Sequence, residues 1–175
     1  MKRFLLTVGR LEPRKNQLNL IRAVRDAGFP KLIVVGNPVA GFEAYAARCR
    51  AEAGEDVVFL PGIDHESPLL ASAYHGCDAY ALPGWFETPG LVALEAALAG
   101  TALAVTEVGS TREYFGSHAA YFDPSSPASM RRALQEALRR GPSTALRQEA
   151  ARRYTWEAVA LQTLEDYKSV LGESR

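Results

Sequence analysis

This sequence of 175 residues has few cysteines, no formal net charge and no long uninterrupted hydrophobic run. Two cysteines, Cys49 and Cys77, are too few for a disulfide framework or a metal knuckle, which favours a reducing compartment. Twenty basic and twenty acidic residues cancel, so overall charge does not predict a nucleic-acid partner. The longest hydrophobic tract, residues 91–105, is interrupted by Glu95, which argues against a membrane span. We therefore expect a globular cytoplasmic protein, with no indication of a membrane surface as partner.

Familiar ligand motifs are also missing. The chain has neither a Walker A sequence nor a GxGxxG after a strand, so a dinucleotide site loses its main support. The three histidines, His65, His75 and His118, lack the spacing of metal ligands, and we expect no metal site. The arginine-rich stretch 131–153 is typical of a solvated helical face with pairs four residues apart.

What the sequence does contain is a regular alternation of strand and helix patterns. Short β-rich runs stand at residues 4–8, 31–35, 57–60, 79–82, 102–106 and 120–122, with helical spacing between them. This alternation predicts a doubly wound α/β fold, with a mainly parallel six-stranded sheet in the order 3-2-1-4-5-6. From about residue 126 the pattern becomes wholly helical, with helices expected at 127–140, 144–154 and 155–171. We predict one domain over residues 1–175.

Several residues have the chemistry of helix N-caps. These are Asn16, Ser67, Ser126 and Thr155, and Ser110 with Glu113 has the spacing of a capping box.

Ligands of such sheets bind beyond the carboxyl ends of the strands, which here places five loops at the expected site. They are residues 9–16, 36–41, 61–66, 83–89 and 107–113. In the first loop, Arg10 and Lys15 lie near a predicted helix start, where cations are unfavourable unless a strong anion lies between them. Alternatively, both are surface charges, for example paired with Glu12.

The loop at residues 83–89 leads into an unusually apolar helix, in the stretch GWFETPGLVALEAALAG. Thr88 and Pro89 have the chemistry of an N-cap and a first helical residue. The backbone amides of Gly90, Leu91 and Val92 would then point out of the top of the sheet.

Two acids flank that helix start. Glu87 is expected in the cleft, or else as a plain exposed acid of the loop. Glu95 is expected to be buried, where a carboxylate needs a partner. That partner is either a vicinal diol of a ligand, such as a ribose, or an internal hydrogen bond from a neighbouring hydroxyl or amide.

At this point the sequence resembles a known family. The segments FLLTVGRLEPRKNQLNLIRAV, ALPGWFETPGLVALEAALAGTALAVTEVGSTREYFG and YFDP are similar to the C-terminal half of group 1 (family 4) retaining glycosyltransferases with the GT-B fold. The likeness covers about residues 4–171, and its most specific element is the E-x7-E motif of Glu87 and Glu95. It implies a Rossmann-like, donor-binding domain whose site consists of Gly9, Arg10, Lys15, Gly62, Ile63, Glu87, Gly90, Leu91, Val92 and Glu95.

The resemblance also implies a role for each part of that site. Arg10 and Lys15 would hold the diphosphate of a UDP-, GDP- or ADP-sugar, Glu87 would face the sugar, and Glu95 would hold the ribose hydroxyls. The loop at residues 61–66 would meet the base, and amides at the start of the helix would reach the phosphate or sugar. The implied reaction transfers a hexose, with retained configuration, to a glycan, lipid or small molecule. No Asp-x-Asp stands at a strand end, which fits a site without metal or cofactor.

Two departures from the family pattern stand out. Gly84 occupies a position where the family often has serine, a change we expect to be tolerable. The N-terminal, acceptor-binding domain is absent, so we expect an excised domain or a partner chain, and little or no turnover by this chain alone. The last helix, which in the family often crosses to the other domain, would then be partly uncovered. Alternatives are half of an epimerase with the same fold, or an interaction module without transferase activity.

Overall fold

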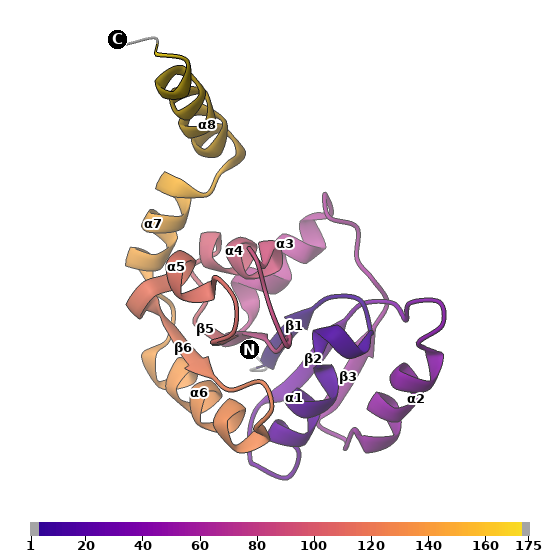
Figure 1. Ribbon diagram of the computed structural model, residues 1–175. Coiled ribbons are helices and arrows are strands. Elements are labelled where there is room, and N and C mark those ends of the chain that lie inside the picture. Colours follow the sequence, from indigo (N-terminus) through magenta and orange to yellow (C-terminus); the bar gives the residue numbers. More distant parts are fainter. Residues whose placement is uncertain (1–3, 173–175) are drawn as a thin grey trace.

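Six parallel strands form one sheet at the centre of the molecule (Figure 1). The computed structural model describes residues 4–172, so both ends of the predicted 1–175 domain lie outside the described residues. The strands are β1 (Phe4–Val8), β2 (Lys31–Val35), β3 (Val57–Leu60), β4 (Ala79–Leu82), β5 (Leu103–Thr106) and β6 (Ala119–Phe122). Their order, β3-β2-β1-β4-β5-β6, confirms the predicted doubly wound sheet. β5 starts one residue later and β6 one residue earlier than predicted.

Helices cover both faces of this sheet. They are α1 (Gln17–Val24), α2 (Glu43–Glu52), α3 (Pro68–Gly76), α4 (Leu91–Leu98), α5 (Thr111–Phe115), α6 (Pro127–Arg140), α7 (Thr144–Arg153) and α8 (Trp156–Leu171). Two short 3-10 turns, η1 (Pro13–Lys15) and η2 (Gly116–His118), complete the set. Buried residues of α1, α2 and α6 form a core on one face, and those of α3, α4, α5 and α7 form a core on the other.

The period of the strands explains why two cores form. Successive side chains of a strand point to opposite faces, so Leu5 joins the core under α1 and α6 while Leu6 joins the core under α3 and α4. The central strands β4 and β5 are buried along their whole length, as expected for parallel strands covered on both sides. At the edge, β3 alternates between half-buried and exposed residues.

Side-chain capping is confirmed at Ser67, Ser126 and Thr155, whereas Asn16 and Ser110 stand at the N-cap positions of α1 and α5 without a capping hydrogen bond from the side chain. The hydroxyl oxygens of Ser67, Ser126 and Thr155 each accept a hydrogen bond from a backbone amide in the first turn of α3, α6 and α8. Asn16 precedes α1 in a left-handed conformation (φ 54°), and its side chain bonds elsewhere. Ser110 forms no capping box, because the amide of Glu113 donates to the backbone carbonyl of Ser110 rather than to its hydroxyl.

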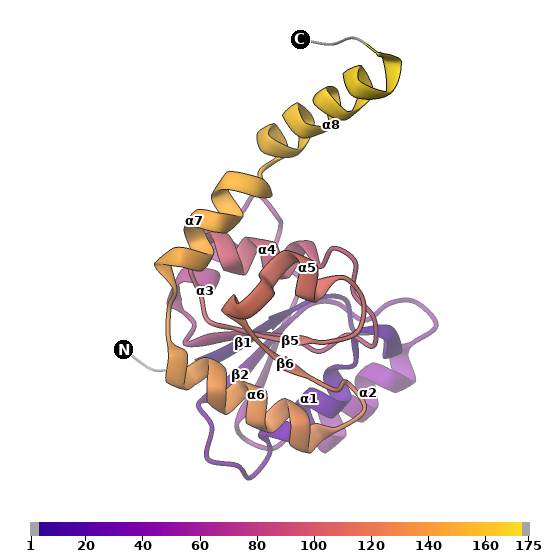
Figure 2. The same ribbon diagram turned by 60° about the vertical axis from the view of Figure 1, so that its left-hand side comes forward.

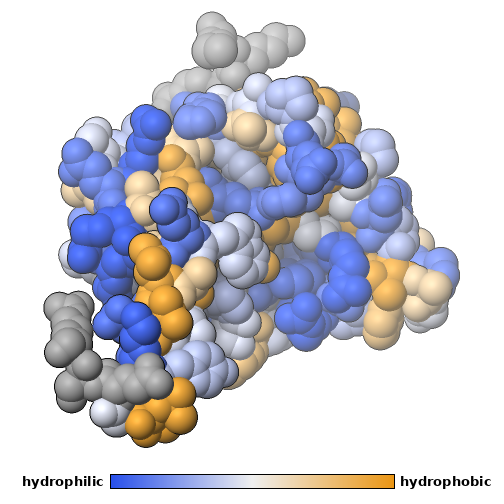
Figure 3. Space-filling model, turned by 90° about the horizontal axis from the view of Figure 1, so that it is seen from above, coloured by the Kyte–Doolittle hydropathy of each residue, from blue (hydrophilic) through white to orange (hydrophobic). Residues whose placement is uncertain are grey.

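The C-terminal helices leave the sheet in stages. α6 packs beside β5 and β6, α7 lies across α4, and α8 extends away from the body (Figure 2). No described residue of α8 is buried, and the Trp156 side chain at its start is 80% exposed. In the space-filling view, hydrophobic residues reach the surface in separate groups among hydrophilic ones (Figure 3). Among residues 4–172, no helix combines the length and apolar character needed to cross a membrane.

Candidate functional site

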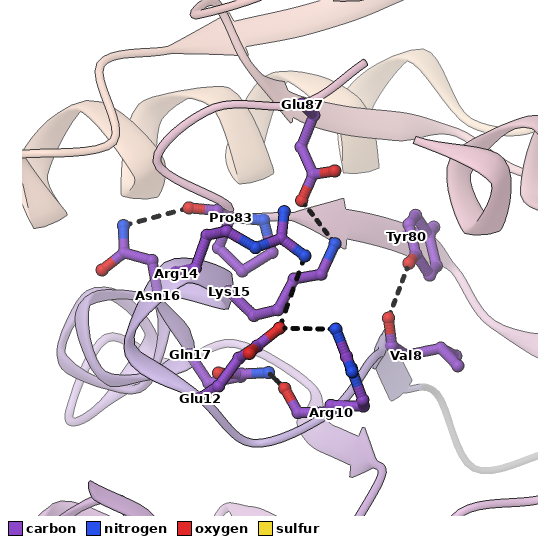
Figure 4. Close-up of polar contacts among 10 residues, drawn as sticks. All are labelled: Val8, Arg10, Glu12, Arg14, Lys15, Asn16, Gln17, Tyr80, Pro83 and Glu87. Carbon is purple, nitrogen blue, oxygen red and sulfur yellow. Dashed lines mark hydrogen bonds and ion pairs between the residues drawn. The ribbon is translucent and has the colours of Figure 1, made fainter. Parts of the chain in front are cut away.

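Loops from several strands are tied together at the carboxyl edge of the sheet. The buried Asn16 donates from its side-chain amide to the carbonyl of Pro83, 3.0 Å away, and to that of Pro124, 2.8 Å away. The backbone amide of Trp85 donates to the carbonyl of Arg14. These bonds join the loop after β1 to the loops after β4 and β6, so side chains distant in sequence meet here (Figure 4).

The position of Glu87 is fixed by the next loop along the sheet. Its amide donates to the carbonyl of Val108, and its carbonyl accepts from the amide of Ser110, which makes a small parallel bridge with residue 109. Gly109 has a φ of 102°, and a Cβ there would collide with the Glu87 backbone. Only glycine suits that position, and it lets the two loops pack closely enough to hold Glu87 in place.

The side chain of Glu87 is buried and paired with Lys15. Glu87 is 4% exposed, and its Oε1 lies 2.8 Å from the Nζ of Lys15, which is itself mostly buried (Figure 4). The alternative of a plain exposed loop acid is therefore wrong, because the side chain is buried in its ion pair with Lys15. Lys15 and Glu87 lie together at the site, as a direct ion pair.

Arg10 lies apart from that pair. Its side chain is 66% exposed, and its guanidinium donates to Oε1 of Glu12, 3.2 Å away. Arg14 also donates to that oxygen, at 3.4 Å. This contact is the alternative that the sequence left open for Arg10. The same residue lines a cavity of about 460 Å³ at the ends of β1, β2 and β3. Gly9, Gly62 and Ile63, three further predicted site residues, line that cavity as well.

Glu95 lines a second cavity, of about 240 Å³, between α3 and α4. Its side chain is 26% exposed, so the expected full burial is wrong: Ala93, Leu94, Ala96 and Ala97 face the core, while Leu91 and Glu95 lie on the open edge of α4. The hydroxyl of Tyr74 donates to its Oε2 at 2.7 Å, which is the internal hydrogen bond considered from the sequence. Oε1 lies 3.5 Å from Nδ1 of the exposed His65.

The start of α4 differs from the prediction. The helix begins at Leu91 with Gly90 as N-cap, so neither Thr88 nor Pro89 belongs to it. The peptide bond between Thr88 and Pro89 is cis. Gly90 has a left-handed backbone (φ 66°), and a Cβ there would lie 2.9 Å from Leu82. Within residues 4–172, the backbone amides of Leu91 and Val92 have no hydrogen-bond acceptor, as is usual in a first helical turn.

The chain is similar to known proteins over most of its length. The family model described as glycosyl transferases group 1 matches residues 1–154, most of the chain and all six strands. The chain belongs to the group 1 glycosyltransferase family.

Individual relatives of this group 1 chain are enzymes of greater length. It is 31% identical to a D-inositol 3-phosphate glycosyltransferase of Nocardioides sp. over 98% of its own residues and 42% of that protein. It is 28% identical to a glycogen synthase of Thermus thermophilus, covering 96% of its own residues and 39% of that protein. Among solved structures, the sucrose-phosphate synthase of Thermosynechococcus elongatus superposes with a TM-score of 0.82 at 27% identity, over 99% of this chain and 46% of that one. The chain therefore spans less than half the length of each of these relatives.

The predicted site residues of the group 1 chain fall into three neighbouring places. Gly9, Arg10, Gly62 and Ile63 share the larger cavity, Lys15 pairs with Glu87, and Glu95 lies in the smaller cavity, with Gly90, Leu91 and Val92 between the two acids in sequence. The loop after β3 connects the cavities, because Gly62 and Ile63 line one and His65 lines the other.

Sequence reasoning missed two residues that organise the site. Asn16 was expected to cap a helix but instead ties three loops together. Tyr74 received no role, although it stands four residues after the buried Leu70 on α3 and carries a hydroxyl on that buried face. No group of three or more His, Cys, Asp or Glu side chains able to hold a metal occurs in the part of the chain that the structure describes.

Proposed function

We propose that this chain is the donor-binding half of a retaining, metal-independent hexosyltransferase whose donor is a nucleoside diphosphate sugar. Membership of group 1 supports glycosyl transfer in general. The observation that carries the proposal is the meeting of Lys15 with Glu87 beside the cavity of Gly9 and Arg10, at the carboxyl edge where sheets of this kind bind ligands.

The diphosphate would lie against Lys15, Arg10 and the start of α4. An ammonium group has three donors, so Lys15 can keep its bond to Glu87 and still donate to a phosphate oxygen. Arg10 is largely exposed and only loosely held by Glu12, so its guanidinium is free to turn towards an anion. The amides of Leu91 and Val92, at the positive end of the α4 dipole, add further donors.

These groups suggest how the reaction proceeds. Breaking the bond between sugar and phosphate leaves negative charge on the departing diphosphate, and fixed cations and amides stabilise that charge without a metal. Glu87, held by its backbone and by Lys15, would orient the sugar. The acceptor would attack from the face that the diphosphate leaves, which retains configuration.

The nucleoside would extend towards the loop after β3. The side chain of Glu95 is 26% exposed and its Oε2 accepts from Tyr74, which leaves Oε1 suited to the hydroxyls of a ribose. Gly62 and Ile63 would meet the base, mostly through backbone groups.

The acceptor would be held by another part of the enzyme, whether on the same polypeptide or on a partner chain. Large apolar side chains stand exposed around the Glu87 loop and along α8: Trp85, Phe86, Leu91, Val108, Trp156, Val159, Leu161, Leu164, Tyr167, Val170 and Leu171. An acceptor-binding domain would cover part of this surface. We expect residues 1–175 alone to bind donor and to turn it over little or not at all.

Calorimetric titration with UDP, GDP and ADP, with and without Mg²⁺, tests the proposal. We expect one of the three to bind with a Kd between about 1 µM and 1 mM, which corresponds to about 4 to 8 kcal/mol, and Mg²⁺ to leave it unchanged. Lys15→Ala and Glu95→Ala should each weaken binding about tenfold or more, because each removes a charged hydrogen-bond partner of the ligand.

Two exposed residues away from the site provide matched controls. Arg139→Ala on α6 and Glu55→Ala before β3 remove the same charges elsewhere and should leave Kd unchanged. Binding that survives both site substitutions would place the nucleotide elsewhere. Failure of all three nucleotides to bind would favour an interaction module that keeps the fold without the chemistry.

A further inference from the structure

Tyr74 connects α3 to the E-x7-E helix through one short hydrogen bond. Its side chain is 4% exposed, and its hydroxyl donates to Oε2 of Glu95 at 2.7 Å. This length is typical of a charge-assisted bond between a hydroxyl and a carboxylate. Tyr74 and Glu95 both line the cavity of about 240 Å³, so the bond lies at the wall where we place the ribose.

The tyrosine ring is itself fixed from behind. It packs against the ring of the fully buried Tyr80, with centroids 5.7 Å apart and planes inclined by 59°. The Tyr80 hydroxyl donates to the carbonyl of Val8, at the end of β1, where Val8 lines the larger cavity (Figure 4). The hydroxyl of Tyr74 therefore has little freedom, because its ring is held by a residue anchored in the centre of the sheet.

The chemistry of the pair sets which group donates. Burial, with Tyr80 and Glu95 nearby, raises the pKa of Tyr74 above its usual value, so the hydroxyl keeps its proton and donates to the carboxylate. Glu95 lies on the open edge of α4, where nothing among the described residues bonds to Oε1 except the contact with His65 at 3.5 Å. A glutamate in such a place would otherwise turn among several rotamers in water.

From this geometry we infer that Tyr74 is a positioning residue, which fixes Oε2 of Glu95 so that Oε1 is presented to the ribose hydroxyls of a nucleoside diphosphate. The inference rests on the proposed function. Tyr74 touches no substrate atom in this role. Because Tyr74 already holds the Glu95 side chain, less conformational entropy is lost when a diol binds. Affinity therefore rises only for ligands whose hydroxyls donate hydrogen bonds to Glu95.

Tyr74→Phe tests this role, because it keeps the ring and removes only the hydroxyl. Two probes are titrated by calorimetry. The first is whichever of UDP, GDP and ADP binds most tightly, and the second is the 2′-deoxy form of the same nucleotide. We expect the wild-type chain to prefer the ribonucleotide about tenfold. Tyr74→Phe should weaken the ribonucleotide about fivefold and the deoxynucleotide less than twofold, so that most of the preference disappears.

Tyr45→Phe is the matched control. Tyr45 also has a hydrogen-bonded hydroxyl, which accepts from the Leu18 amide and donates to Oε1 of Gln17 on the other face of the sheet. It should bind both probes as the wild type does. Thermal unfolding of both variants verifies that each is folded at the temperature of the titrations.

The outcomes separate the inference from the proposed function. If Tyr74→Phe leaves both affinities unchanged, or weakens both probes equally, Tyr74 does not position Glu95 for a diol, while donor binding stands. The same conclusion follows if the wild type binds both probes equally well, because Glu95 then has no ribose hydroxyl to hold. If the wild type binds none of the three nucleotides, the proposed function fails, and the inference fails with it.

Discussion

The surroundings of Glu87 and Glu95 differ in burial and in the charge of the partner. Glu87 is buried against the ammonium of Lys15, whereas Glu95 is a quarter exposed and bonded to a neutral hydroxyl. A buried ion pair costs several kcal/mol when only one partner is removed, while a solvated acid tolerates the loss of its partner. The first acid is thus part of the folded framework, and the second keeps an oxygen available. The E-x7-E spacing alone shows none of this difference.

Removal of the cation from the Glu87 pair should have the largest effect on stability. Lys15→Met leaves the Glu87 carboxylate buried without a charged partner, so we expect the free energy of unfolding to fall by about 3 kcal/mol. Urea denaturation measures it. Arg14→Met, which removes an exposed cation one residue away, should cost less than about 1 kcal/mol. Equal effects of the two substitutions would show that the Lys15–Glu87 pair is not part of the framework.

The second largest loss of stability is expected when the side-chain hydrogen bonds of Asn16 are removed. Asn16→Gly keeps the left-handed backbone but removes the amide that donates to the carbonyls of Pro83 and Pro124. We expect a loss of about 2 kcal/mol in denaturant unfolding, because the buried carbonyl of Pro83 loses its donor and that of Pro124 keeps only the bond from Asn19. The control is Asn19→Ala, because alanine suits the helix in which Asn19 lies. It removes a single, partly buried hydrogen bond to the carbonyl of Pro124. The prediction is wrong if Asn19→Ala costs as much as Asn16→Gly.

A smaller loss of stability is expected from a substitution at Gly84, which lies close to the Glu87 carboxylate. A Cβ at this position would overlap Oε1 of Glu87, so Gly84→Ala forces the carboxylate to shift away from Lys15. We expect a loss of between about 1 and 2 kcal/mol, with the same denaturant measurement. Gly54→Ala, where the new Cβ would meet only ordinary contact with Arg25, should be nearly neutral. A neutral Gly84→Ala would show instead that the Lys15–Glu87 pair can accommodate a Cβ at this position.

The smallest effect belongs to the Glu95 side and depends on pH. Burial above all raises the pKa of Tyr74, so the folded state keeps a proton that the unfolded state loses near pH 10. The contribution is therefore complete below pH 10 and is lost as pH rises above it. In urea titrations, Tyr74→Phe should lose about 1 kcal/mol less stability between pH 10 and 11 than the wild type does. Tyr45→Phe should show a similar reduction, because burial raises the pKa of Tyr45 as well. An unchanged slope would show that Tyr74 ionises normally.

The sequence predicted the sheet well because strand periodicity and β-rich runs are local signals. All six strands, their order and the helical C-terminal region follow from them. The degree of burial of Glu87 and Glu95 could not be predicted from such local signals. The apolar run around Glu95 indicates a helix with little polar surface, but only the packing of α4 leaves Leu91 and Glu95 on an open edge. Glu87 turns inward because of the contact with Gly109, twenty-two positions later.

Partners of polar side chains were the hardest part of the site to predict. Asn16 has the residue type of a cap, yet its acceptors are carbonyls brought close by two other loops. Lys15 was expected to face an anion, and the structure provides one from the protein itself, at Glu87. Both contacts are non-local, so residue type and spacing could indicate the edge of the sheet where they meet but not the pairing.

Helix α8 has a consequence for the dynamics of the chain. Sixteen residues form it, none of the described ones is buried, and an isolated helix of that length is only marginally stable in water. Its amide protons should therefore exchange with deuterium orders of magnitude faster than those of α4, which open only with the core. A protein surface that packs against α8 would slow this exchange, so the exchange rate of the α8 amides reports whether a partner is bound.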